Sequence, residues 1–262
     1  MGTTQLARPI GRCRLRGDVG AHPRDQQPAA IDRHHRHQHS RPTLSYRGLL
    51  LSVTWLAAAF GAFAAYWLLS AGLTWAPDCL HEVAGLTPKQ AGAMVTATAV
   101  GNAVVLLSRG LLARRSTRKG IAPRLPVGLG GGLLMCVAAL PIAVFAEVDS
   151  VGVKIALMVG PMTLTNVILT ISQTAVARIT PAGQRGVALG ALAFVYALAG
   201  TLSPLVTGRL VDAGASVPAS YRSAYLLMAG LVAAAAVLAV CFLRPERDAA
   251  RLGVAEASPA VH

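Results

Sequence analysis

Long apolar runs alternate with short charged segments along most of this chain. Six runs contain no Asp, Glu, Lys, Arg or His, and most of them are near the ~20 residues that an α-helix needs to cross a bilayer. They cover residues 49–74, 91–107, 125–146, 155–176, 187–207 and 225–243. Because the runs are continuous rather than alternating, they exclude lipid-exposed β-strands. The pattern predicts an all-α integral membrane protein with six transmembrane helices.

The regions outside the apolar runs divide the chain into three parts. Residues 1–47 are rich in Arg and His and lack apolar periodicity, so we expect a basic, disordered tail. Residues 48–244 form the transmembrane domain, and residues 245–262 form a second tail. The histidines of the first tail could hold a metal ion weakly, but a plain polar tail is the favoured interpretation, and we expect neither a metal site nor a cofactor. These histidines are His34, His35, His37 and His39.

The charged residues indicate an orientation. Only 13% of the chain is charged, yet the net charge is +13. Of the 24 Lys and Arg residues, 20 lie in the two tails and in the second and fourth connections between spans. Cytoplasmic loops of membrane proteins carry such an excess, so both termini are predicted to be cytoplasmic, in the cell inner (plasma) membrane. The same rule explains the basic charge without a nucleic-acid partner.

The basic connection between the second and third runs contains a recognisable motif. Its glycine is Gly110, and its basic residues are Arg114, Arg115, Arg118 and Lys119. The segment resembles the signature loop of the major facilitator superfamily, in which the glycine lets two helix ends approach closely. Arg114 stands where that family usually has Asp, which puts the charge-relay role of that position in doubt. An ordinary inside-positive loop remains the alternative interpretation.

Two further segments resemble organic-anion (anion:cation symporter) members of that superfamily. One runs from Trp75 to Gly92, like their outer loop after the seventh helix, and the other from Ile179 to Gly208, like their tenth-to-eleventh helix region. The resemblance covers about Gly48 to Arg247 and matches the carboxy-terminal six-helix half. It implies two three-helix inverted repeats, alternating access, and symport of a small organic anion with a proton or sodium ion.

Small and helix-bending residues predict close helix contacts in two runs. Gly200, Pro204 and Gly208 recur every four residues, so they give one face of a helix room for a neighbour. Gly160 and Pro161 offer a kink in the fourth run. Ordinary small-residue packing is the alternative interpretation of the first set.

Polar residues inside the apolar runs are candidates for a substrate cavity. Several in the fourth run recur at helical spacing and so share one face. A transporter needs such groups to replace the water around its solute. Helix-to-helix hydrogen bonding is the alternative. The candidates are Tyr66, Asn102, Asn166, Thr170 and Gln173.

No catalytic constellation is present in the runs, so an enzyme is not expected. The expected partners are the lipid bilayer, a small solute with a proton or sodium ion, and a missing amino-terminal half or a second copy of the chain. The alternative function is a truncated or frameshifted remnant that inserts into the membrane and carries nothing. The composition of residues 1–47, which resembles a gene read out of frame, favours this alternative.

Overall fold

The computed structural model describes residues 44–118 and 127–254, which form helices joined by short connections. The α-helices are α2 (Tyr46–Leu50), α3 (Val53–Glu82), α4 (Pro88–Arg118), α5 (Val127–Glu147), α6 (Val151–Val159), α7 (Thr165–Ile179), α8 (Arg185–Ala213), α9 (Val217–Phe242) and α10 (Pro245–Arg251). Two 3-10 turns, η1 (Pro161–Leu164) and η2 (Ala182–Gln184), precede α7 and α8.

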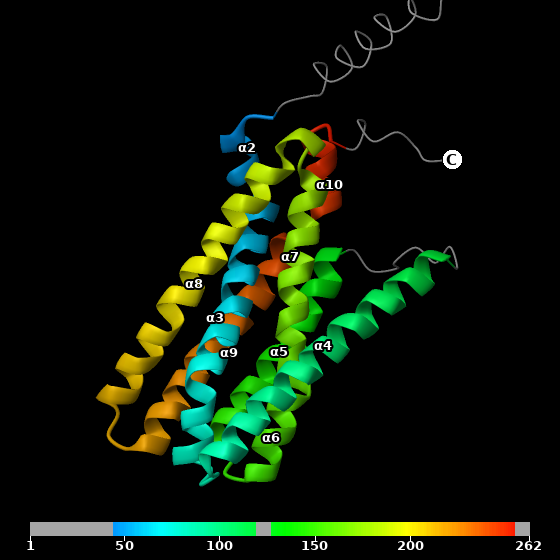
Figure 1. The fold of residues 1–262 in the computed structure, drawn as a ribbon. Coiled ribbons are helices and arrows are strands. Elements are labelled where there is room, and N and C mark those ends of the chain that lie inside the picture. The colour runs from blue at the N-terminus through cyan, green and yellow to red at the C-terminus, as the bar shows by residue number, and fades with distance from the viewer. Residues whose placement is uncertain (1–43, 119–126, 255–262) are drawn as a thin grey trace, which may run out of the picture. The chain divides into compact units, whose positions relative to one another are not determined.

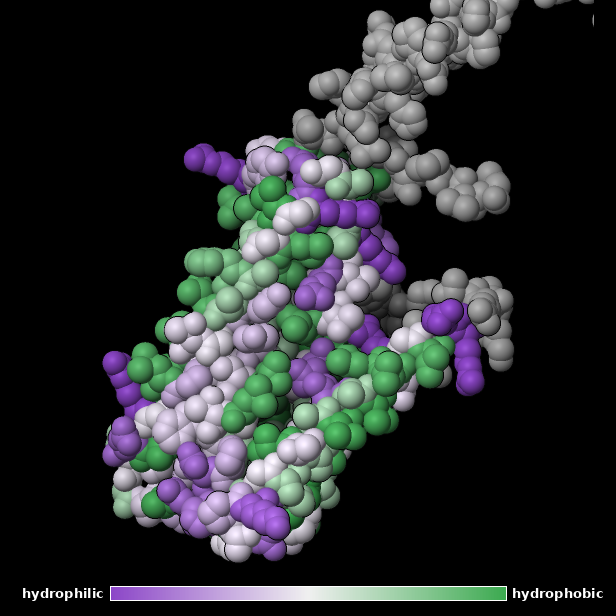
Figure 2. All heavy atoms as spheres, in the orientation of Figure 1, coloured by the Kyte–Doolittle hydropathy of each residue, from purple (hydrophilic) through white to green (hydrophobic). Residues whose placement is uncertain are grey.

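Six helical segments in these residues are long and apolar enough to cross a membrane, which confirms the predicted architecture. They are Val53–Glu82, Pro88–Leu111, Gly130–Glu147, Val151–Ile179, Ala182–Ala213 and Val217–Phe242. Figure 2 shows mostly apolar or near-neutral side chains over the middle of the bundle, and strongly hydrophilic ones toward its two ends and at the end of α4. The short helices α2 and α10 lie at the same end of the bundle, which is called the terminal end below (Figure 1).

Most of the helices extend beyond the predicted runs at one end or at both, because a helix continues into the interface where charged residues are tolerated. The first span begins at Val53 and ends at Glu82. Ser52 caps its start, where its side chain accepts a hydrogen bond from the Trp55 N–H (3.3 Å). The beginning of the predicted outer loop, residues 75–82, is therefore helical. The second span begins at a capping box that the sequence contains but periodicity does not reveal. Thr87 N–H donates to Gln90 Oε1 (3.0 Å), and Gln90 N–H donates to Thr87 Oγ1 (3.4 Å).

We expected spans without charged residues. This is true of the predicted apolar runs but wrong for the longer helices of the structure. Arg109 lies inside the second span and donates to the Val167 carbonyl of α7 (3.2 Å). Lys154 lies inside the fourth span, is only 6% exposed, and donates to the Phe145 carbonyl (3.3 Å). Its ammonium also sits 5.0 Å from the centre of the Phe145 ring. Both long side chains reach a main-chain oxygen, which lowers the cost of burying their charge.

Helix α3 lies at the centre of the bundle and contacts α4, α7, α8 and α9 (Figure 1). Its buried face is built from small residues such as Ala58, Ala62 and Ala65, which let neighbouring backbones approach. Helices α5 and α9 share an extensive contact, where a Cβ at Gly132 would lie 2.5 Å from a Val240 side-chain carbon. By contrast, almost none of the α4 span is buried and little of α8 is.

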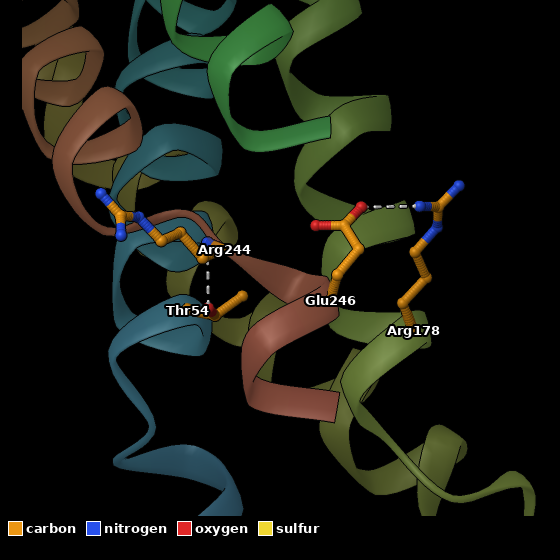
Figure 3. Close-up of polar contacts among 4 residues, drawn as sticks. All are labelled: Thr54, Arg178, Arg244 and Glu246. Carbon is orange, nitrogen blue, oxygen red and sulfur yellow. Dashed lines mark hydrogen bonds and ion pairs between the residues drawn. The ribbon is translucent and has the colours of Figure 1, made fainter. Parts of the chain in front are cut away.

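The terminal end is fastened by contacts between distant parts of the chain. Helix α10 lies against the start of α3 and the end of α7 (Figure 3). Asp248 Oδ2 accepts from the Thr54 N–H (3.2 Å) in the first turn of α3, and the Arg244 N–H donates to Thr54 Oγ1 (3.3 Å). Arg178 and Glu246 form an exposed ion pair (3.2 Å). Part of the predicted carboxy-terminal tail is thus an ordered helix that caps the first span.

A second set of hydrogen bonds between distant parts of the chain joins the segment before α2 to η2. Gln184 donates from Nε2 to the Leu44 carbonyl (2.8 Å) and accepts from the Leu44 N–H at Oε1 (3.0 Å). The compact unit accordingly begins before residue 48, the boundary expected from composition. Most of the predicted basic tail, including its histidines, lies outside the described residues.

Candidate functional site

The fourth span is broken in its middle. Helix α6 ends at Val159, Gly160 has a non-helical backbone (φ −94°, ψ −101°), and Pro161 opens the 3-10 turn η1. The Thr163 N–H bonds the Gly160 carbonyl (3.1 Å) instead of the Val159 carbonyl that a continuous helix would offer it. The Val159 oxygen is thereby released toward α4, where a Cβ at Gly101 would lie only 2.7 Å from it. A glycine is required at this contact.

A cavity of about 290 Å³ lies beside this break, at the small end of the range for small-molecule pockets. Its walls come from α3, α4, α6, η1 and α7, with one residue from α9. Most of the lining is apolar, and no charged side chain of the described residues contributes to it. The polar lining residues are Thr98, Asn102, Thr163, Thr165, Asn166 and Tyr225.

Two of the five predicted cavity residues meet in this cavity. Asn102 of α4 and Asn166 of α7 both line it. The Asn102 Oδ1 is buried and has no hydrogen-bond partner in the described chain. A buried polar atom without a partner is uncommon in a folded chain and is costly at this depth.

The other three predicted cavity residues lie elsewhere. Tyr66 lines a second hollow of about 300 Å³ between α3 and α8, where its ring packs against Tyr196 with 5.1 Å between centres. Thr170 is exposed and Gln173 is half-buried, and neither lines either hollow. Periodicity places these two residues on the face of Asn166, but the cavity ends closer to the break.

The predicted packing residues of α8 lie against α3. A Cβ at Gly200 would lie 2.7 Å from Tyr66 Cε1, and a Cβ at Gly208 would lie 2.9 Å from Trp75 Cζ2. Pro204 lacks the N–H that would bond the Gly200 carbonyl, and Ser70 Oγ donates to that carbonyl instead (2.8 Å).

Two more hydrogen bonds flank this one along the α3–α8 contact. Trp75 Nε1 donates to the Pro204 carbonyl (3.1 Å), and Ser203 Oγ donates to the Trp67 carbonyl (2.7 Å). Side chains on both helices thus bond main-chain oxygens of the other, so the contact combines close packing with interhelical hydrogen bonds.

Two of the crystal structures to which the chain is similar are of a bacterial homologue of the human lysosomal transporter Spinster. One, inward-facing and occupied, matches with a TM-score of 0.50 at 17% identity, covering 82% of this chain and 53% of that chain. The other, inward-facing and unoccupied, matches with a TM-score of 0.51 at 18% identity, covering 82% and 51%. The fold is that of half a major facilitator transporter. This chain therefore spans about half the length of the structures it matches. No protein-family model matches the sequence, and no curated protein matches it.

Within this half fold, the signature segment differs from its predicted form. Gly110, Arg114, Arg115 and Arg118 belong to α4 rather than to a loop, and Lys119 lies outside the described residues. A Cβ at Gly110 would meet nothing of the described chain within 4 Å, so none of the described helices approaches closely there. The expected close approach occurs instead at Gly101, nine residues earlier in α4.

The residues that sequence reasoning missed are those whose role depends on a distant partner. Gly101, Arg109 and Lys154 carry no local signal beyond their type. The described residues contain no cluster of His, Cys, Asp or Glu suited to a metal ion. Among the described residues, the site consequently offers neutral hydrogen-bonding groups in a mainly apolar cavity.

Proposed function

We propose that this chain is one half of an alternating-access membrane transporter for a small organic solute. The observation that carries the proposal is the half-facilitator fold, which matches about half the length of a transporter structure. The cavity beside the broken fourth span adds support, since transporters bind solutes near the midplane beside interrupted helices.

Transport by this mechanism needs a second six-helix unit. Alternating access moves two bundles against each other around a shared site. The α4 and α8 spans are the least buried of the six, so they are the faces that a second bundle can cover. The second unit is a separate amino-terminal half or another copy of this chain, oriented alike because the same charge bias acts on each copy.

The plasma membrane with both termini in the cytoplasm is the proposed setting. The terminal end bears Arg47, Arg178, Arg185 and Arg244, consistent with a cytoplasmic end. The sequence resemblance adds an organic anion as the solute and a proton or sodium ion as the coupling ion. The mainly apolar lining of the cavity supports an organic solute in this hypothesis.

A reconstitution experiment separates a transporter half from a remnant that carries nothing. The purified chain and a tandem fusion of two copies are placed in liposomes, and counterflow of labelled aromatic carboxylates and phenyl glucoside is measured. We expect saturable counterflow from the tandem and none from the single chain, because one bundle cannot alternate access alone.

The Asn166→Leu change in both copies of the tandem is the cavity variant, and protein-free vesicles are the background. Counterflow that Asn166→Leu removes supports the proposal. Absence of counterflow from both proteins, with both shown to be inserted and folded, excludes another copy of this chain as the second unit and leaves a separate amino-terminal half or the remnant. Saturable counterflow by the single chain would contradict the need for a second unit.

A further inference from the structure

Arg109 is the charged residue of the second span that faces the inside of the bundle. Between residues 100 and 111 of α4, every position is exposed except four. These four are Gly101, Asn102, Val105 and Arg109. They recur at helical spacing, so they form the one face of α4 that neighbouring helices partly cover. From this face Arg109 donates to the Val167 carbonyl of α7 (3.2 Å), so its side chain points between α4 and α7 rather than into lipid.

The Arg109 guanidinium meets α7 near the middle of the fourth span. Val167 lies twelve residues before Ile179, where α7 ends close to α10 at the terminal end. At 1.5 Å per residue the Val167 carbonyl is about 18 Å from that helix end, while half of the hydrocarbon layer is about 15 Å thick. An arginine keeps its charge at this depth, and a charge inside a membrane span usually marks a functional site.

The described chain offers no carboxylate to neutralise this charge. Between residues 44 and 244 the carboxylates lie in the last turns of α3, α5 and α8 and in the connection to α6, all at the bundle end opposite the terminal end (Figure 1). They are Asp78, Glu82, Glu147, Asp149 and Asp212. Glu246 and Asp248 of α10 bond to other residues. A guanidinium has five N–H donors, and within the described residues its hydrogen bond is the one to Val167.

This charge lies on the terminal side of the cavity beside the broken span. On α4, Arg109 follows Asn102 by two helical turns, and on α7 it bonds the residue after Asn166. Both asparagines line the cavity, whereas Arg109 does not. Arg109 is nevertheless partly exposed, unlike Lys154, which is 6% exposed and covered by Phe145. A solute that extends beyond the cavity can therefore meet the guanidinium.

We infer that Arg109 is the anion-binding residue of this half, and that it holds the carboxylate of a solute whose apolar part extends into the cavity. The planar guanidinium fork matches the two oxygens of a carboxylate. The cavity lining beyond it is mainly apolar, which suits the rest of such a molecule. The inference rests on the proposed function for the idea that the bound molecule is carried.

Two probes of one shape test the assignment. They are 3-phenylpropanoate, which is an anion, and 3-phenylpropanamide, which is neutral. Equilibrium dialysis against the full chain in dodecyl maltoside micelles, which contain no phosphate, measures saturable binding of each labelled probe. We expect the carboxylate to bind about tenfold more tightly than the amide, or better, which is the usual effect of one hydrogen bond to a charged group.

Four variants connect this preference to Arg109 and to the cavity. Arg109→Gln removes the charge but keeps an N–H for the Val167 carbonyl, and it should leave the two probes binding about equally. Arg109→Met is a second variant without the charge and has the same expected result. Lys154→Met is the matched control, because it removes an equal charge from another span and should leave the preference unchanged. Gly72→Leu fills the cavity from a position with open space around Cβ, so it should weaken the binding of both probes.

A lipid phosphate is the other source of an oxyanion for Arg109. In that case phosphatidylglycerol added to the micelles would displace 3-phenylpropanoate, and phospholipid would copurify with the wild type but not with Arg109→Gln. This outcome would overturn the assignment to a solute. We expect no such competition, because the apolar part of the probe is held by the cavity.

Circular dichroism and gel filtration establish that each variant is folded. A carboxylate preference that survives Arg109→Gln or Arg109→Met would overturn the inference, and so would a preference that Lys154→Met removes equally. Absence of saturable 3-phenylpropanoate binding would also overturn it. Counterflow by the tandem without a carboxylate preference would uphold the proposed function alone, whereas binding that depends on Arg109, without counterflow, would uphold this inference alone.

Discussion

Replacing Ser70 with alanine will weaken the α3–α8 contact through a carbonyl on the other helix. In an unbroken helix the Gly200 oxygen would accept from the N–H of residue 204, but residue 204 is proline. Ser70 Oγ takes the place of that N–H at 2.8 Å. Ser70→Ala therefore leaves a half-buried carbonyl without either donor, and the loss should appear in the free energy of unfolding.

The expected magnitude follows from two bounds. An unsatisfied buried carbonyl costs about 1–3 kcal/mol, whereas interhelical hydrogen bonds in membranes average about 0.6 kcal/mol and reach about 1.7 kcal/mol. Ser70 and Gly200 are half-buried rather than fully buried, so we expect a loss of about 1 kcal/mol for Ser70→Ala. In a Pro204→Ala background the helix regains its own N–H, and Ser70→Ala should then cost about 0.6 kcal/mol or less.

Tryptophan fluorescence suits the measurement, because all three tryptophans of the chain, Trp55, Trp67 and Trp75, lie in α3. Unfolding by SDS in mixed micelles would be followed for the wild type, both single variants and the double variant. Thr74→Val is the control, since the exposed Thr74 hydroxyl bonds a carbonyl of its own helix. Equal costs of Ser70→Ala in the two backgrounds would refute the substitution of Ser70 for the missing N–H.

Three further predictions concern orientation and the two ends of the bundle. In a cysteine-free background, a cysteine at Gly183 should react with an impermeant maleimide only from the cytoplasm and one at Ser150 only from outside; the reverse would contradict the topology. Asp248→Ala removes a helix cap and should lower the free energy of unfolding, measured by SDS unfolding, by about 0.5–2 kcal/mol. Glu246→Gln breaks only the exposed ion pair with Arg178 and should lower it by about 0.5 kcal/mol or less. In the same assay Lys154→Met should be nearly neutral, because it keeps the packing and removes a buried charge, and Lys154→Glu should cost about 3 kcal/mol or more; equal effects would contradict this account.

The membrane spans were the feature best predicted from the sequence, because the bilayer itself restricts which structures can cross it. Every main-chain polar group must be satisfied within the hydrocarbon, so continuous apolar runs predict helices almost without regard to tertiary contacts. The six spans follow from this rule. The end of the first span was placed too early, because Asp78 and Glu82 continue α3 beyond its apolar run.

The contacts that hold the terminal end together could not be predicted, because they join residues far apart in the sequence. The Thr54 N–H and Asp248 are 194 residues apart, and Leu44 and Gln184 are 140 apart. Nothing in a single sequence indicates which of several polar residues will meet. The same limit applies to the cavity, where helical spacing grouped Thr170 with Asn166 although the break in the fourth span confines the cavity to one part of that face.

In water, the exposed apolar surfaces of α4 and α8 would indicate a protein partner. In a bilayer they do not. Their exposed Leu and Val side chains are satisfied by lipid tails, so apolar exposure alone demands no protein partner. Polar atoms do demand one, since lipid offers no hydrogen bonds. The Asn102 oxygen, which is buried and has no partner in the described chain, is such an atom. The proposed need for a second half therefore rests on the alternating-access mechanism, which moves two bundles around a shared site, rather than on the extent of the apolar surface.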